Sequence, residues 1–424
     1  MSQMSIYDLL IVGGGPAGLT AGIYGARSGL KTLVLEKGAV GGMAFTTREL
    51  INYPGFFKET TGPAVMEAMA EHARTFGAEI GGKEEAVDFD LSGEVKIVRT
   101  NKNREYRAGA LILAPGSEPR LLNIPGEREL RGCGVSYCAT CDAEFYRDLD
   151  VVVVGNGDAA IEEAIYIAKF ARKVRVIVIH DEGVVDCNRL SAGRAFKNPR
   201  IEFVWNSVLA EIRGGEEVEG AVLRNLKTNA LTEIAVSGVF IYVGMTPKTA
   251  LLRNKVELSA AGCILTNDRM ETSVEGVFAA GDVREKAVRQ VVTAASDGAI
   301  AAVSAERYLA EMATFREEVL EGSAPVLLAF WEPAARGCIE ALARIENSLA
   351  PLAARVKLVK IDVSRKKEIA RMYGVSAVPS ALLLSGGEKI ADLSGCLPPG
   401  GNLEAGMAAA LERGGVNAEA AGTN

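Results

Sequence analysis

Two segments of the 424-residue chain repeat one local pattern, in which an apolar strand runs into a glycine-rich turn and then a helix. The strand at 7–12 leads to Gly13-Gly-Gly15-Pro-Ala-Gly18, and the strand at 150–154 leads to Gly155-Asn-Gly157-Asp-Ala-Ala160. Glycine permits the tight turn and lets a phosphate approach the backbone, while the helix N-terminus attracts negative charge. The repeat therefore predicts an α/β chain with two Rossmann-like, three-layer domains, each of which binds a dinucleotide.

The residue that ends each unit indicates how a ribose is held. The second strand of the first unit, 31–36, ends on Glu36. A carboxylate at this position accepts hydrogen bonds from the hydroxyls of an adenosine ribose. The corresponding strand of the second unit, 173–180, ends on His180 and is followed by Asp181.

Between the two units lies the stretch Val135-Ser-Tyr-Cys138-Ala-Thr-Cys141-Asp142. Two cysteines at this spacing close and reopen a disulfide, because one thiol has a lowered pKa and its thiolate is the attacking group. Asp142 is placed to exchange a proton with the sulfurs. The alternative is half of a structural zinc site, but the other cysteines are scattered singly and both histidines are distant in sequence. Redox chemistry is therefore favoured, and no metal is expected.

The composition excludes several kinds of partner. Lys and Arg number 47 and Asp and Glu number 54, so the net charge is −7. This balance argues against nucleic acid or an anionic membrane as the main partner. The apolar runs are too short to span a bilayer, and residues 1–6 show no signal-peptide pattern. Seven cysteines in so long a chain do not form a secreted disulfide scaffold, so we expect a cytoplasmic protein.

The rest of the chain predicts further strands and helices, with a separate, smaller α/β domain beginning at Pro325. In the first 314 residues the expected strands lie at 87–98, 106–113, 200–205, 218–225, 238–243 and 262–266, and the helices at 63–76 and 289–309. In the smaller domain the expected strands lie at 326–330, 356–361, 381–384 and 390–393, and the helices at 339–350 and 366–373. A charged run near 313–323 marks the boundary, and the tail after Leu411 is predicted to be disordered.

Over its first 314 residues the chain resembles the low-molecular-weight, FAD-dependent thioredoxin reductases. The matching motifs are the two glycine turns and Glu36, Gly41-Gly, Asn52-Tyr-Pro-Gly, Cys138-Ala-Thr-Cys141-Asp142, Gly276-Val-Phe-Ala-Ala-Gly-Asp282 and Arg289-Gln290. From about 323 to 412 the chain resembles thioredoxin. There Phe330-Trp331-Glu-Pro-Ala-Ala335-Arg-Gly-Cys338 aligns with the active-site stretch, and Ala377-Val378-Pro379 aligns with the cis-proline turn.

The resemblance implies how the domains are arranged and what the reaction is. It implies an FAD domain at 1–116 and 248–314, an inserted NAD(P) domain with the cysteine pair at 117–247, a linker at 315–322, a thioredoxin-like domain at 323–412 and a tail at 413–424. It implies a homodimer in which one domain rotates against the other during turnover. It also implies that Cys141 faces the flavin, that Cys138 attacks the disulfide of a thioredoxin-like protein, and that Asp142 donates and accepts the proton.

The resemblance further assigns cofactor contacts. The residues that would contact FAD are Gly13, Gly15, Pro16, Ala17, Glu36, Lys37, Gly42, Asn52, Val87, Ala114, Gly116, Gly281, Asp282, Arg289, Gln290 and Val291. The residues that would contact NAD(P) are Gly155, Gly157, Asp158, Ala159, Ala160, His180, Asp181 and Gly244. Met43 stands where the family usually has Gln, which removes a polar contact near FAD.

The nicotinamide side departs most from the family. NADPH-using members carry His-Arg-Arg where this chain has His180-Asp181-Glu182. Losing two charge-assisted hydrogen bonds to the 2′-phosphate and placing carboxylates there predicts a loss of NADPH affinity on the order of hundredfold or more. Asp181 or Glu182 could instead accept the ribose 2′-OH, so NADH is favoured over NADPH. The alternative is that FAD receives electrons from ferredoxin or another carrier.

The C-terminal domain departs as well. Ala335 occupies the position of the nucleophilic cysteine and Ala329 that of the buried acid, so Cys338 is left without a partner or base. We therefore expect a docking or dimer-shaping domain, or a platform that mimics a partner thioredoxin, in preference to a catalytic role of Cys338 alone or with Cys396. The predicted function is that of a flavin-dependent disulfide oxidoreductase. The alternatives are a reductase of a peroxiredoxin system and a redox-regulatory flavoprotein with vestigial turnover.

Overall fold

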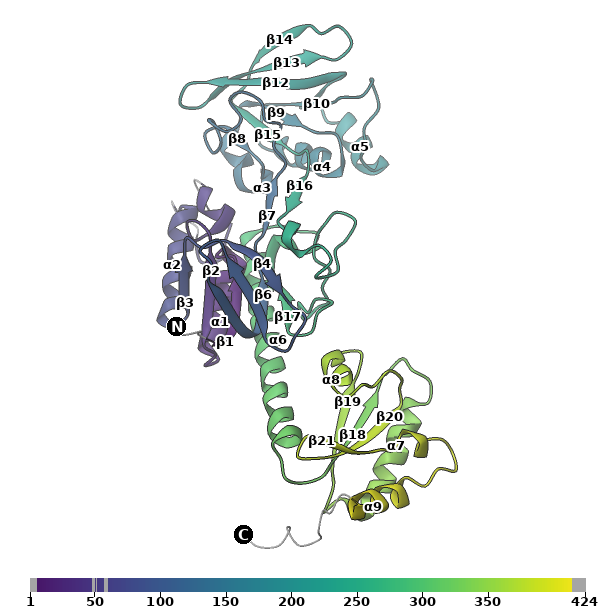
Figure 1. The fold of residues 1–424 in the computed structure, drawn as a ribbon. Helices are drawn as coiled ribbons and strands as arrows, with labels where there is room; N and C mark the ends of the chain where they lie inside the picture. Colours follow the sequence, from purple (N-terminus) through teal and green to yellow (C-terminus); the bar gives the residue numbers. More distant parts are fainter. Residues whose placement is uncertain (1–5, 48–49, 51, 57–59, 414–424) are drawn as a thin grey trace.

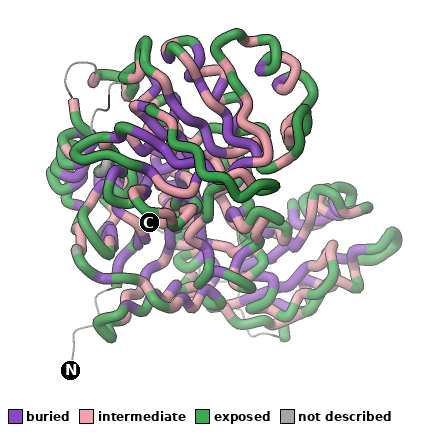
Figure 2. The backbone as a smooth tube through the Cα atoms, turned by 90° about the horizontal axis from the view of Figure 1, so that it is seen from above, coloured by how far each residue is buried: buried purple, intermediate pink, exposed green. Residues whose placement is uncertain are grey.

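The computed structural model describes residues 6–413 apart from 48–49, 51 and 57–59, and it shows three α/β parts one after another in space (Figure 1). The part with the first glycine turn (the first domain) lies in the middle, between the inserted domain and the C-terminal domain. Buried residues run along the strands of the sheets, whereas the loops are largely exposed (Figure 2). The predicted class, two Rossmann-like domains with parallel sheets and a thioredoxin-like domain, is confirmed. No helix in the described part of the chain has the length and apolarity of a membrane span.

The first domain is built on a seven-stranded sheet in the order β3-β2-β1-β6-β5-β4, with β17 also paired to β6. The strands are β1 (Ile6–Val12), β2 (Thr32–Glu36), β3 (Glu79–Gly82), β4 (Ala86–Asp90), β5 (Lys96–Thr100), β6 (Glu105–Leu113) and β17 (Val277–Ala279). The helices are α1 (Pro16–Arg27), α2 (Gly62–Thr75) and α6 (Val291–Phe315). Helices α1 and α6 pack very closely, because a Cβ at Gly298 would lie 2.1 Å from the Ala17 carbonyl oxygen.

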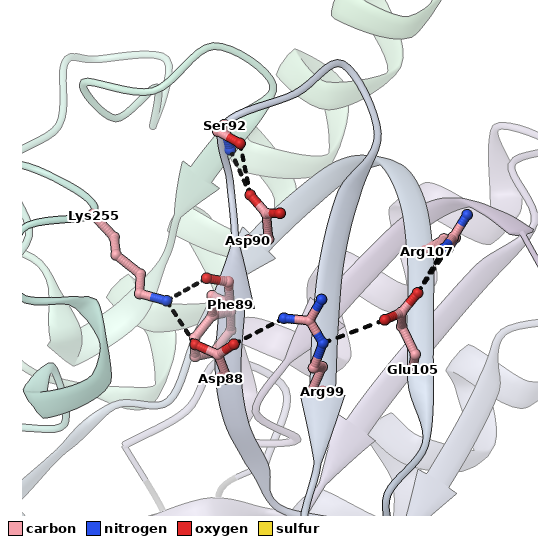
Figure 3. A network of polar contacts seen from close by, with 8 residues as sticks. All are labelled: Asp88, Phe89, Asp90, Ser92, Arg99, Glu105, Arg107 and Lys255. Atoms are coloured by element: carbon pink, nitrogen blue, oxygen red, sulfur yellow. Dashed lines mark hydrogen bonds and ion pairs between the residues drawn. The ribbon is translucent and has the colours of Figure 1, made fainter.

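The first domain is discontinuous in sequence, and Figure 3 shows polar contacts that join its two halves. Lys255, from the later half, donates to the Asp88 carboxylate at 2.7 Å, and Arg99 donates to the same carboxylate at 2.9 Å. These hydrogen bonds, chiefly that from Lys255, hold the pKa of Asp88 at about 2. The Asp88 and Arg99 side chains are solvent-exposed, so their ion pair adds little stability. The halves are also joined by the backbone pairing of β17 with β6 and by apolar packing, in which Leu252 and Val256 share one core with strands of the earlier half.

The inserted domain combines a five-stranded parallel sheet, β11-β10-β9-β15-β8, with a three-stranded antiparallel sheet, β12-β13-β14, that packs against it. The strands are β8 (Val135–Ser136), β9 (Asp150–Val154), β10 (Lys173–Ile177), β11 (Ile201–Val204), β12 (Ser207–Gly214), β13 (Val218–Asn225), β14 (Leu231–Ala235) and β15 (Gly238–Ile241). The helices are α3 (Ala139–Asp142), α4 (Asp158–Ile167) and α5 (Arg189–Phe196). Two short paired strands, β7 (Ser117–Pro119) and β16 (Met245–Pro247), connect this domain to the first.

The C-terminal domain has a four-stranded sheet in the order β19-β18-β20-β21. The strands are β18 (Val326–Trp331), β19 (Lys357–Asp362), β20 (Ser380–Ser385) and β21 (Glu388–Asp392), and the helices are α7 (Cys338–Leu349), α8 (Lys367–Met372) and α9 (Leu403–Arg413). The Val378–Pro379 peptide bond is cis, as the resemblance to thioredoxin implies.

The segment predicted as a linker, 315–322, is largely helical in the structure. Helix α6 runs to Phe315, and a π-helical turn continues over Arg316–Leu320. Phe315 and Val319 are buried in the same apolar cluster as Phe330 of β18. The charged residues that suggested a boundary therefore mark the solvent face of a helix, and this helix contributes to the cores of both domains.

Some local predictions are wrong. No strand forms at 262–266 within the described ranges, where Ile264 makes only isolated bridges with Leu258 and Arg284. The region 87–98 holds parts of two strands joined by a turn, rather than one strand. Strands β12 and β14 and helices α5 and α9 were not predicted. Strand β14 is mostly exposed and partly polar, so its sequence carries a weak strand signal. The predicted disordered tail lies, from residue 414 on, outside the described residues.

Candidate active site

The cysteine pair lies in a short turn of the inserted domain. After β8, Cys138 precedes the one-turn helix α3, and a disulfide joins Cys138 to Cys141 with their Cα atoms 5.3 Å apart. The Cys141 backbone N–H donates to the Cys138 carbonyl at 3.3 Å, which closes the turn. The predicted pair is thus brought into bonding distance. Within the described ranges, no three His, Cys, Asp or Glu side chains gather as a metal site requires.

Asp142, which follows Cys141 directly in sequence, is partly buried. This burial raises the pKa of its carboxyl, while a hydrogen bond from Ser136 Oγ to Asp142 Oδ2, at 2.5 Å, acts in the opposite direction. The Ser136 hydroxyl also accepts from the Cys138 N–H at 3.1 Å, so it links the acid to the redox turn. A carboxyl that keeps its proton above the usual range can supply it to a neighbouring thiolate. Ser136 was not predicted, because a serine two residues before a cysteine forms no specific pattern.

The redox turn faces the first domain. Gln290, at the N-terminus of α6, donates from Nε2 to Thr140 Oγ1 at 2.8 Å and lies 3.7 Å from Cys138 Sγ. Asn52 Nδ2 in turn donates to Gln290 Oε1 at 3.2 Å. Asn52 and Gln290 are both predicted FAD contacts. The structure therefore brings the disulfide to the place where these residues meet.

A cavity of about 1770 Å³ opens between the first and inserted domains, and its wall includes Cys138, Cys141 and Asp142. The predicted FAD contacts on this wall are Gly13, Gly15, Pro16, Ala17, Glu36, Lys37, Gly42, Asn52, Ala114, Gly116, Gly281, Asp282, Arg289, Gln290 and Val291. Val87 is the exception, because its side chain is exposed and the neighbouring Ala86 lines the wall. Ordinary ligand pockets have roughly 300–1,000 Å³, so this cavity has room for an extended dinucleotide.

The wall of the cavity fits a polar, phosphate-containing ligand. Gly15 and Gly42 face each other, and a Cβ at Gly42 would lie 3.2 Å from the Gly15 Cα, so larger residues would narrow the passage. Asp282 Oδ1 and Arg289 Nε are buried without a hydrogen-bond partner among the described residues. Buried polar atoms almost always have partners, so these two atoms indicate a missing polar group such as FAD.

Glu36 shapes the first glycine turn itself. Its two carboxylate oxygens accept hydrogen bonds from the backbone N–H of Gly14 at 2.7 Å and of Gly38 at 2.9 Å. Each carboxylate oxygen has a second acceptor position. Glu36 can therefore hold the turn and still accept hydroxyls of a ribose.

The second glycine turn does not line this cavity. Gly155 has a φ of +127°, and a Cβ there would lie 2.4 Å from the Tyr242 carbonyl oxygen, so no other residue fits the turn. Gly157 precedes α4, and Asp158 accepts from the backbone and side-chain N–H groups of Asn188. Among the predicted NAD(P) contacts, Ala159 and Ala160 follow in α4, whereas Gly244 lies beyond β15 with a φ of +113°. The helix N-terminus at this turn fits a phosphate.

The acids beyond β10 are paired. Asp181 forms an ion pair with Lys227 from the loop between β13 and β14, and the hydrogen bond from Lys227 lowers the pKa of Asp181. His180 Nε2 lies 2.9 Å from Asp186 Oδ2. The fold thus brings one cation to a site where the local sequence shows only acids. Lys227 is 46 residues from Asp181, so no sequence pattern pointed to it.

The C-terminal domain has no disulfide at its active-site stretch. Cys338 is fully buried at the start of α7, and Ala329 is fully buried in β18. Cys338 and Cys396 are both free thiols in the structure. Because Ala335 replaces the nucleophile, this stretch presents no reactive thiol to solvent.

Comparisons with known proteins agree with this site. A family described as pyridine nucleotide-disulphide oxidoreductase matches residues 7–298, and the thioredoxin family matches residues 307–409. A thioredoxin reductase of Peptoclostridium acidaminophilum is 50% identical over 311 residues, which cover 72% of this chain and 98% of that protein. A bifunctional thioredoxin reductase/thioredoxin of Mycobacterium leprae is 36% identical over 433 residues, which cover 92% of this chain and 94% of that protein.

Solved structures give the same result for the first two domains. The thioredoxin reductase of Streptococcus pyogenes has a TM-score of 0.69 and 41% identity, and the match covers 73% of this chain and all of that one. The thioredoxin reductase of Giardia duodenalis has a TM-score of 0.67 and 37% identity over 73% of this chain. Together with the disulfide on the cavity wall, these matches show that the chain belongs to the pyridine nucleotide-disulphide oxidoreductases and is a flavin disulfide oxidoreductase of the thioredoxin reductase type.

Proposed function

We propose that this enzyme passes electrons from a reduced nicotinamide, NADH in preference to NADPH, to the Cys138–Cys141 disulfide and on to the disulfide of a thioredoxin-like protein. The observation that carries the proposal is the disulfide on the wall of the cavity that the predicted FAD contacts line. When bound, FAD would accept a hydride from the nicotinamide and pass the electron pair to the disulfide. The names of the relatives support a thioredoxin-like acceptor.

The chain's own residues carry out the thiol chemistry. Reduction breaks the Cys138–Cys141 bond with two electrons, and Asp142 gives its proton to one of the two sulfurs. The Cys138 thiolate then attacks one sulfur of the acceptor disulfide and releases the other as a thiolate. Cys141 attacks the mixed disulfide next, which frees the reduced acceptor and re-forms the internal bond. Asp142 takes its proton back from Cys141 as that thiol becomes the nucleophile.

The acceptor needs access to Cys138, which in this arrangement contacts Gln290 of the first domain. We therefore include a rotation of the inserted domain about the β7–β16 connection in the proposal. The homodimer, the cytoplasmic location, the cofactor contacts and the domain division at 1–116, 117–247, 248–314 and 323–412 remain predictions of the same proposal.

The preference for NADH rests on the acids beyond β10. Glu182 is exposed, and Asp181 is already paired with Lys227. A 2′-phosphate would meet one lysine in place of the family's arginines, and two carboxylates next to it. Lys is a weaker partner than Arg for a phosphate, because it lacks the planar, bidentate donor pair.

Anaerobic mixing of the FAD-loaded enzyme with NADH, NADPH or reduced ferredoxin tests the donor through loss of flavin absorbance. Faster loss with NADH supports the proposal, and faster loss with NADPH overturns the preference. Loss with ferredoxin alone would identify a protein donor, and no loss with any donor would favour a regulatory role.

The substitution Cys138→Ser should abolish reduction of a protein disulfide and preserve flavin reduction. Normal turnover by this variant would remove Cys138 from the role proposed here.

A further inference from the structure

We propose that Thr140, which lies between the two cysteines, is a latch that holds the redox turn against the first domain and must open before the inserted domain can rotate. This inference rests on the proposed function in one respect, because that function explains why the inserted domain would rotate. The latch consists of Thr140, Gln290 and Asn52, so it combines the turn with two segments of the first domain.

The three side chains form a directed chain of hydrogen bonds. Asn52 Nδ2 donates to Gln290 Oε1 at 3.2 Å, and Gln290 Nε2 donates to Thr140 Oγ1 at 2.8 Å. Thr140 Oγ1 lies 3.4 Å from Cys138 Sγ. A disulfide sulfur carries no hydrogen, so in the oxidised enzyme the Thr140 hydroxyl is the donor in this contact. The hydrogen bonds therefore run in one consistent direction, in which Gln290 and Thr140 each accept one and donate the next, and such chains of hydrogen bonds strengthen one another.

Of the residues in the latch, Thr140 is the one to substitute, because its side chain has few other roles besides the hydrogen bond with Gln290. Its side chain is exposed, so it contributes little to the core of the inserted domain. Gln290 also forms a capping box with Thr293 at the start of α6, and it is a predicted FAD contact. The Gln290–Thr140 bond does not depend on whether the sulfurs are oxidised, because neither of its atoms is a sulfur.

The test measures how often Cys138 becomes accessible in the FAD-loaded enzyme reduced with dithiothreitol. Alkylation of Cys138 by iodoacetamide is followed by mass spectrometry of its peptide. Loss of one net hydrogen bond shifts an equilibrium about two- to twelvefold. Thr140→Val should therefore raise the alkylation rate by about this factor, and Thr140→Ser, which keeps the hydroxyl, should react at the wild-type rate.

Two controls separate a latch from other effects. Thr232→Val, on the exposed strand β14, makes the same chemical change away from the interface and should leave the rate unchanged. The rates are measured across pH, because a changed thiol pKa would alter the rate only below the plateau. An unchanged plateau rate in Thr140→Val would overturn the latch.

A double-mutant cycle provides a second test. If Thr140 and Gln290 act together, Gln290→Leu should raise the rate less in the Thr140→Val variant than in the wild type, whereas fully additive effects would contradict the proposal. The readout requires no turnover, so the latch and the proposed function fail separately. Normal disulfide reduction by Cys138→Ser would refute the function without touching the alkylation result.

Discussion

The first domain is joined to its two neighbours in different ways. Two paired strands of three residues each, β7 and β16, lead to the inserted domain, and the redox turn adds hydrogen bonds from Gln290. The C-terminal domain instead begins on the same helix that packs in the first domain, and Phe315 and Val319 at its end are buried in the second core. A short ribbon with a polar latch can open at small cost, whereas a shared helix cannot bend without exposing apolar side chains.

Polar contacts also differ between the two joints. At the C-terminal joint, Glu275 of the first domain accepts from the backbone N–H of Glu368 at 3.0 Å, and so caps α8 of the neighbouring domain. Lys366 pairs with Glu311 at 2.7 Å and lies over the ring of Tyr308. The comparison is the basis for proposing that the joint next to the disulfide moves, whereas the joint to the C-terminal domain is held by a shared helix and buried side chains.

The largest expected effect lies at the moving joint. Asp142→Asn should lower disulfide reduction about 10²- to 10⁴-fold, because the variant has no proton to give. In the wild type, the pKa of Asp142 is raised by burial, so its donor form should persist above the usual range and be lost as the pH rises through the raised value. The measurement is the steady-state rate against pH with a thioredoxin-like substrate.

A matched change inside the C-terminal domain should have no such effect. Cys338→Ala replaces a buried thiol in the C-terminal domain, and turnover should be unchanged. A loss of turnover in this variant would show that the C-terminal domain takes part in the chemistry, and would contradict the contrast drawn here between the two joints.

The next largest effect concerns the shared helix. Phe315→Ala should destabilise the C-terminal domain by about 3–5 kcal/mol, because it leaves a cavity in the core of that domain. Urea unfolding followed by the fluorescence of Trp331, with Trp205 changed to Phe, reports on this domain. Phe76→Ala, at an exposed phenylalanine of the first domain, is the control and should shift stability by less than about 0.5 kcal/mol. If Phe315→Ala leaves the urea midpoint of the Trp331 transition unchanged, the helix connects the two domains without stabilising the C-terminal one.

The smallest effect concerns the cap between the domains. Glu275→Ala should lower the free energy of unfolding of the C-terminal domain, again followed by Trp331 fluorescence, by about 0.5–2 kcal/mol, the usual contribution of a helix cap. Burial raises the pKa of Glu275, so the folded state binds its proton more tightly than the unfolded state. Its contribution to stability should fall as the pH rises from the ordinary towards the raised pKa, and Glu275→Gln should remove this dependence. The same pH dependence in Glu275→Gln would assign it to other groups.

Much of the site was readable from local sequence. The turns at Gly13 and Gly155, the acid at Glu36 and the pair Cys138–Cys141 are short-range patterns, since glycine's backbone freedom and the two-residue spacing act within one turn. Val87 is less directly placed than the other predicted FAD contacts, because strand alternation turns its side chain away from the face on which Ala86 lines the cavity, and its contact with FAD stays a prediction.

Contacts between distant segments were not readable. Lys227 reaches Asp181 across 46 residues, Gln290 reaches Thr140 across 150, and Glu275 reaches the start of α8 across 93. The charged residues at 315–322 indicated a linker between domains. The apolar residues of this segment, Phe315 and Val319, could be recognised as core residues only once the fold had placed them in the core of the C-terminal domain. Residue types and spacing thus specify the redox turn and the nucleotide turns, because their geometry is local. Which groups surround them, and which joint can open, is decided by packing between segments that no local pattern relates.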